Sequence, residues 1–139
     1  MKNWLYADIT SDILKAYFAV YNTLKHRRAY SEENFAQALI FELVKKSRQA
    51  KAQVAVQRHY EDKRIGTDLV DVVVDDKVVI EIKRVAALKE IHLDQIKTYL
   101  LDGHWAVGLV LNFGGDEPEF RRIENRSAPA YLQHLTQRG

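Results

Sequence analysis

Residues 71–83 have the sequence DVVVDDKVVIEIK, in which two β-branched runs flank a short polar break. Val and Ile favour strands, and a polar break between two such runs is typical of a tight turn. The stretch therefore predicts an antiparallel hairpin whose loop is formed by residues 75–77. In that register Asp71 lies opposite Glu81, and directly opposed residues share a face of the sheet. The hairpin thus brings two carboxylates together on a short, rigid platform.

The same register divides the other hairpin side chains between two faces. Val74 then lies opposite Val78, and one face is wholly apolar: Val70, Val72, Val74, Val78, Ile80 and Ile82. The other face carries Asp71, Val73, Val79, Glu81 and Lys83. A two-residue turn would move Asp71 to the face opposite Glu81, because side chains alternate along a strand. A joint carboxylate site therefore depends on the three-residue loop.

Two interpretations of this polar face are open. In the plainer one, Asp71, Glu81 and Lys83 are solvated side chains on the wet face of a sheet. In the other, the two carboxylates bind a hard divalent cation such as Mg²⁺, which prefers oxygen ligands and keeps several waters. A lysine beside such a site can hold a phosphate or position an attacking water.

Asp71 followed by Glu81-Ile82-Lys83 resembles the D…(D/E)XK signature of the PD-(D/E)XK nuclease superfamily, with Val70 in place of the proline that often precedes the aspartate. More narrowly, the chain resembles the GxxExxY family of small bacterial proteins. Four segments match in order, within about residues 10–123: AYSEENF at 29–35, the hairpin at 71–83, QIKTY at 95–99 and VGLVLNFG at 107–114. In the first segment Glu32 matches the glutamate of the family motif, whereas its glycine is Ala29 and its tyrosine is Phe35.

The resemblance implies an α/β, restriction-endonuclease-like fold, in which a mixed β-sheet is flanked by α-helices. It also implies Mg²⁺-dependent hydrolysis of phosphodiester bonds in nucleic acid, with DNA as the expected substrate and Mn²⁺ as a substitute metal. Asp71 and Glu81 would hold the metal, with the main-chain carbonyl of Ile82 as a third ligand. Lys83 would orient the attacking water or neutralise developing charge.

The resemblance assigns roles to three further residues. Glu32 would ligate the metal through a water or tune the site. Gln95 and Tyr99 match a Q-x-x-x-Y pattern that accompanies the D…EXK signature, and would contact the substrate or brace the catalytic groups. Without the resemblance, the same residues read as a helix first turn and a half-buried helix flank.

Periodicity and turn residues predict the remaining elements. The expected helices are 10–25, with Thr10 or Ser11 as its N-cap, a second from the Ser31 N-cap to about Gln49, 86–101 and 128–137. The expected strands outside the hairpin are 53–60, 105–111 and an edge strand at 119–123, with a polar turn at 61–66. The strand at 78–83, the helix at 86–101 and the strand at 105–111 would form a right-handed β–α–β crossover.

The whole chain sets broader limits. Its 139 residues are expected to form one domain over 1–139, and the absence of cysteine excludes disulfides and thiolate metal sites. No apolar run is long enough to cross a bilayer, so no membrane partner is expected, and the N-terminus lacks the apolar core of a secretion signal. A cytoplasmic location fits. The net charge of +2 does not identify a nucleic-acid binder, although basic residues concentrate between residues 25 and 64.

Two alternatives to a nuclease stay open at this point. One is a catalytically silent nucleic-acid-binding or protein-binding regulatory module on the same fold, because a fold does not imply activity. The other is a structural or oligomerising domain with a polar sheet face, which predicts no metal affinity. A homodimer is compatible with either a nuclease or its alternatives.

Overall fold

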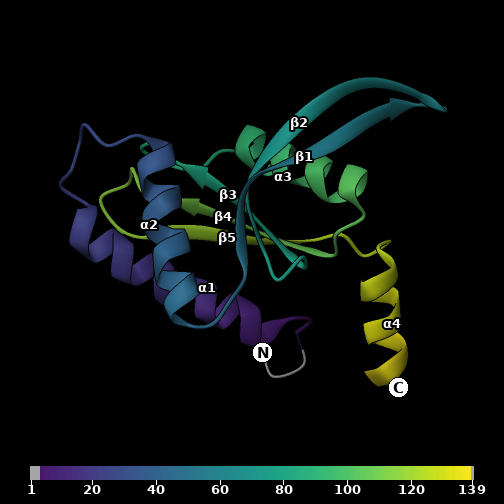
Figure 1. Cartoon of the computed structure of the whole chain (residues 1–139), viewed down its shortest axis with the longest axis horizontal. Helices are drawn as coiled ribbons and strands as arrows, with labels where there is room; N and C mark the ends of the chain where they lie inside the picture. The colour runs from purple at the N-terminus through teal and green to yellow at the C-terminus, as the bar shows by residue number, and fades with distance from the viewer. Residues whose placement is uncertain (1–3, 139) are drawn as a thin grey trace.

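Helices and strands of residues 4–138 are described by a computed structural model (Figure 1). Within these residues the helices are α1 (Ala7–Leu24), α2 (Glu32–Lys45), α3 (Glu90–Gly103) and α4 (Pro129–Arg138). The strands are β1 (Ala50–Tyr60), β2 (Lys63–Val74), β3 (Val78–Lys83), β4 (Val107–Asn112) and β5 (Glu119–Glu124). They form one sheet in the order β1-β2-β3-β4-β5, antiparallel except for the parallel β3–β4 pair. The predicted α/β class with a mixed sheet flanked by helices is confirmed.

The central hairpin has the predicted register. Val74 lies opposite Val78, Val73 opposite Val79, and Val72 opposite Ile80. The loop is therefore the three polar residues 75–77, of which Asp75 and Asp76 adopt positive φ angles of 53° and 55°. Asp is one of the few non-glycine types that tolerates this left-handed conformation, which suits the turn.

Helices cover both faces of the hairpin, and this decides the character of its polar face. α1 and α2 pack on the face that carries Ile80 and Ile82, whereas Ile96, Tyr99 and Leu100 of α3 pack on the face that carries Val73 and Val79. Full burial of a side chain such as Ile80 contributes about 2 kcal/mol, so the two layers hold the register firmly. The interpretation of a merely solvated second face is wrong, because that face lies beneath α3.

The connection from β1 to β2 differs from the prediction. The strands pair from Ala50 opposite Val74 to Tyr60 opposite Lys63, so β1 starts earlier than expected and only residues 61 and 62 form the turn. Only the last residues of β2 also pair with β3, and the outer part of the β1–β2 hairpin extends from the sheet as an arm (Figure 1). The arm carries polar residues on both of its faces, and in the sequence such residues are typical of a turn. The sequence therefore predicted a longer turn than the structure has.

Two helix starts also differ from the prediction. α1 begins after Tyr6, so Thr10 and Ser11 lie inside the helix and neither is its N-cap. α3 begins at Glu90, and residues 84–89 form a loop instead of its first turn. The Ser31 N-cap of α2 is correct, since its hydroxyl accepts a hydrogen bond from the Asn34 amide at 3.2 Å.

Of residues 4–138, no helical segment combines the length and the apolar character needed to cross a membrane.

Candidate active site

The two hairpin carboxylates lie at the end of the paired β2–β3 segment that is far from the turn. The strand pairs end with Val72 opposite Ile80, and Asp71 and Glu81 are the next residues of the two strands. Asp71 Oδ2 also accepts a hydrogen bond of 2.7 Å from the main-chain N–H of Ile82. This bond fixes the Asp71 side chain against β3, so the carboxylate of one strand is held beside the carboxylate of the next.

Glu81 is buried with an incomplete set of partners. Only 4% of the residue is exposed, and its Oε2 atom has no hydrogen-bond partner. Burial is the largest cause that raises the pKa of Glu81 to about 9, followed by the negative charge of Asp71, while Lys83 opposes the shift. Buried polar atoms are nearly always paired, so an orphaned carboxylate oxygen beside a second acid marks a place suited to a cation.

Lys83 is held in place by residues from α3. Its ammonium donates a hydrogen bond of 2.6 Å to Gln95 Oε1, and the amide of Gln95 in turn donates to the Tyr99 hydroxyl at 2.8 Å. Lys83 Nζ also lies 3.8 Å from Glu81 Oε1. Tyr99 is 4% exposed, and this burial is the main reason that its pKa is raised. These contacts favour bracing over substrate contact for Tyr99.

Glu32 lies at the margin of the group and not within it. It is the first residue of α2, is exposed, and accepts a hydrogen bond of 3.0 Å from the main-chain N–H of Arg84 through Oε2. Its negative charge contributes, as a minor cause, to the raised pKa of Glu81. The structure therefore brings five of the predicted residues together: Asp71, Glu81, Lys83, Gln95 and Tyr99. Glu32 lies farther out, at the end of β3.

The donor set can be tested against a metal ion. Among residues 4–138, no cluster of three or more His, Asp or Glu side chains is arranged to hold one. The acidic pair supplies carboxylate oxygens, one of them without a partner. Mg²⁺ typically binds one or two carboxylates and keeps several waters, so a two-carboxylate site fits it, whereas a full protein cage is not required. The residues present fit a hard divalent cation.

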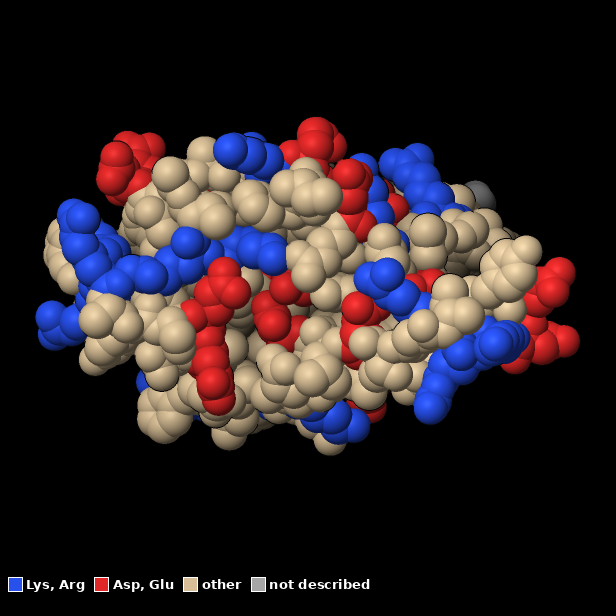
Figure 2. All heavy atoms as spheres, turned by 90° about the horizontal axis from the view of Figure 1, so that it is seen from above, with Lys and Arg blue, Asp and Glu red and all other residues tan. Residues whose placement is uncertain are grey.

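One face of the molecule, seen from above, carries a hollow. Figure 2 shows acidic side chains in a hollow of this face, with basic side chains gathered toward its left end. A cation bound between carboxylates and a nearby basic surface are both suited to a polyanion.

Asn112 is a residue near the site that the sequence interpretation missed. The sequence pattern places it at the start of a turn, yet it is the last residue of β4, is fully buried and lies beside Lys83 in the parallel ladder. Its Oδ1 accepts hydrogen bonds of 3.0 Å from the Val85 and Gly114 amides, and its Nδ2 donates to the Val85 carbonyl at 2.9 Å. The position of a polar residue directly after an apolar run was the one sequence feature that could have indicated its role.

Removing this amide should destabilise the end of β3. We expect Asn112→Ala to lower the free energy of unfolding by about 3 kcal/mol, because three hydrogen bonds of a buried amide to the main chain of Val85 and Gly114 are lost. Urea unfolding measures the change. Asn34→Ala is the control, since it removes an exposed capping amide and should cost only about 1 kcal/mol. Equal losses in the two variants would contradict a structural role for Asn112.

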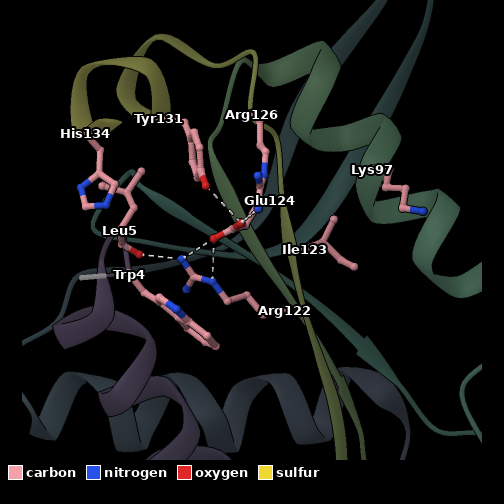
Figure 3. A pocket seen from close by; sticks show the side chains of 9 residues that line it. All are labelled: Trp4, Leu5, Lys97, Arg122, Ile123, Glu124, Arg126, Tyr131 and His134. Atoms are coloured by element: carbon pink, nitrogen blue, oxygen red, sulfur yellow. Dashed lines mark hydrogen bonds and ion pairs between the residues drawn. The ribbon is translucent and has the colours of Figure 1, made fainter. Parts of the chain in front are cut away.

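A separate hollow lies between the start of the chain, β5 and α4 (Figure 3). Arg122 crosses it, donating to the Leu5 carbonyl at 2.8 Å and to Glu124 Oε2 at 3.2 Å, above the ring of Trp4. None of the predicted site residues lines this hollow. Its central charges are paired with each other, which indicates a role in joining the chain start to β5.

A family model matches most of this chain. A family model described as the PD-(D/E)XK nuclease superfamily matches residues 7–123. A search of curated proteins gives no match. A solved structure described as "Crystal structure of SSO0001" aligns with a TM-score of 0.47 at 15% identity, over 84% of this chain and 70% of that chain. Because the family match runs from α1 into β5 and includes the whole acidic hairpin, this chain belongs to the PD-(D/E)XK nuclease superfamily.

Proposed function

We propose that the chain is a divalent-metal-dependent nuclease that hydrolyses phosphodiester bonds in nucleic acid, with DNA as its substrate. The observation that carries the proposal is the buried Glu81, with its unpaired oxygen and raised pKa, held beside Asp71. Perturbed carboxylates of this kind cluster at functional sites. The order of the four matching segments further supports assignment to the GxxExxY family.

The metal site in this proposal consists of the Asp71 and Glu81 carboxylates and the main-chain carbonyl of Ile82. When bound, Mg²⁺ or Mn²⁺ would lower the pKa of a water and offset negative charge on the phosphate. Asp71 is preorganised for this role by the Ile82 amide. Glu81 must give up its proton to become a ligand, so metal uptake and proton release are coupled.

Lys83 acts on the phosphate in this proposal. Its ammonium is fixed by Gln95, so it can donate a hydrogen bond to the phosphate or the attacking water without a large loss of side-chain entropy. Gln95 and Tyr99 are positioning residues that hold the ammonium at the required place. Glu32 tunes the site through its charge and fixes the main chain just after Lys83.

The test combines metal binding and cleavage. We expect the wild type to bind Mn²⁺ in a calorimetric titration and to cleave plasmid or single-stranded DNA with Mg²⁺ or Mn²⁺. Asp71→Asn should lose binding and reduce cleavage to the metal-free background, because one of two carboxylate ligands is removed. Asp76→Asn is the matched control, since Asp76 lies in the exposed turn of the same hairpin and, among residues 4–138, pairs only with Lys51.

The outcomes separate the candidate functions. Cleavage that requires Asp71 and not Asp76 supports the nuclease. Nucleic-acid binding without cleavage in any metal would favour the catalytically silent binding module. Absence of both metal binding and cleavage in the wild type would overturn the proposal.

A further inference from the structure

A pocket of about 560 Å³ lies between the α1–α2 connection, the start of the 84–89 loop and the turn after β4. Its charged lining is mostly basic: Lys25, His26, Arg27, Arg28 and Arg84, with Asp116 as the one acid. The basic residues are exposed. Within residues 4–138, no ion pair joins Lys25, Arg27 or Arg28 to an acidic side chain. The pocket therefore offers positive charge that the protein itself does not neutralise.

Three other basic residues of the first half of the chain are paired with acidic side chains. Arg48 pairs with Asp12 at 3.0 Å and Asp75 at 2.9 Å. Lys51 pairs with Asp76, and Arg58 pairs with Asp68. The basic residues between 25 and 64 are thus divided: some are neutralised by acidic neighbours, whereas in the described part of the chain Lys25, Arg27 and Arg28 of the pocket are not.

The pocket walls are fixed by specific contacts. The Tyr21 hydroxyl donates a hydrogen bond of 2.7 Å to the Gly115 carbonyl. Gly114 lies so close to the 84–85 main chain that a Cβ would come within 2.5 Å of the Val85 nitrogen. The guanidinium of Arg84 donates to the Arg28 carbonyl, which ties the loop after β3 to the α1–α2 connection. A preformed, basic pocket results.

The pocket is linked to the candidate active site through the residues at the end of β3. Arg84 directly follows Lys83, and its main-chain N–H is bound by Glu32. Side chains alternate at the end of a strand, so Lys83 and Arg84 point to opposite sides of one short segment that both sites share.

We propose that this pocket is a phosphate subsite, which holds a backbone phosphate of a nucleic-acid strand next to the phosphodiester that is cleaved. The statement that the neighbouring phosphodiester is cleaved rests on the proposed function. The statement that the pocket binds a phosphate does not. A pocket of this volume accommodates a group of nucleotide size and is much smaller than a duplex surface. Lys and Arg contacts to phosphates set the register of a strand without reading its bases. The substrate class is therefore a strand that can enter a pocket, such as a single strand or a frayed end.

The experiment measures binding apart from catalysis. A fluorescein-labelled single-stranded thymidine oligonucleotide is titrated with the full chain in EDTA, and anisotropy is recorded at several salt concentrations. We expect Arg27→Gln/Arg28→Gln to weaken binding roughly tenfold at low salt. The slope of log K against log salt should fall by about 0.7 for each phosphate that the variant no longer neutralises. Lys63→Gln/Arg64→Gln on the β1–β2 arm removes the same charge and should change the slope little.

Each outcome decides the proposal. Weaker binding confined to the Arg27/Arg28 variant supports the subsite, even if the wild type never cleaves. Equal weakening in both double variants would show that affinity follows net charge alone, and would overturn it. Unchanged binding in the Arg27/Arg28 variant would also overturn it, even if the wild type is an active nuclease. Circular dichroism of each variant confirms that these exposed substitutions leave the fold intact.

Discussion

Glu81→Gln should raise the stability of the metal-free protein by about 3 kcal/mol near pH 7. Folding shifts the pKa of this carboxyl from 4.5 to about 9. At neutral pH the unfolded chain carries an ionised Glu81, whereas the folded chain must hold it protonated, and each pH unit above 4.5 costs about 1.4 kcal/mol. Glutamine keeps the shape of the protonated acid and removes that cost. Urea unfolding in EDTA measures the gain.

The raised pKa of Glu81 also predicts how the stability of the wild type changes with pH. Between pH 4.5 and about 9 the folded state binds more protons than the unfolded state, so the stability of the wild type should fall as pH rises through this window. In Glu81→Gln this component should vanish. Glu33→Gln on the exposed first turn of α2 is the control and should keep the wild-type pH profile. A wild-type profile in Glu81→Gln would show that Glu81 is ionised in the folded protein.

Metal should reverse the order of the two proteins. A cation that binds only the folded state stabilises it by mass action. Ionised Glu81 would then be a ligand of the cation, and its burial would no longer destabilise the folded state. We expect Mn²⁺ to raise the melting temperature of the wild type and to leave that of Glu81→Gln unchanged. The stability gained by the variant would thus come at the expense of the site, as is common where an active site stores strain.

The acidic hairpin could be predicted from sequence because its determinants are local. Alternation of apolar side chains and the three-residue break fix the register, and the register alone puts Asp71 opposite Glu81. The superfamily signature reinforced the same pairing. The mixed sheet followed from the order of the elements, and the family match over residues 7–123 agrees with it.

The burial of the site could not be predicted in the same way. The exposure of Glu81 depends on how α3 packs over β3. This packing is a long-range property, and the hairpin sequence alone does not reveal it. The same holds for Asn112, whose contacts with Val85 span 27 residues of the chain. The length of the β1–β2 arm could not be predicted for a related reason. A hairpin that leaves the sheet buries few side chains, so apolar and polar residues do not alternate strongly along it.

Lys83→Met should reduce the rate of cleavage by about 10²- to 10³-fold at saturating Mn²⁺, the loss typical for removal of one fixed donor to a developing charge. Methionine retains most of the aliphatic length and buries well beside α3. The carboxylates remain, so Mn²⁺ affinity should change far less than the rate. Single-turnover cleavage together with calorimetric Mn²⁺ titration separates these two quantities.

The partners of Lys83 make the prediction specific. Gln95→Ala removes the acceptor that lies 2.6 Å from the ammonium, so it should lower the rate by a smaller factor while the lysine itself is still present. Lys97→Met on the same helix removes an exposed ammonium that pairs with Asp94, and should cleave at the wild-type rate. A Lys83→Met variant with a normal rate and weakened Mn²⁺ binding would assign the lysine to the electrostatics of the metal site. The order wild type, Gln95→Ala, Lys83→Met in falling rate, at nearly constant metal affinity, is the pattern that a positioned catalytic ammonium requires.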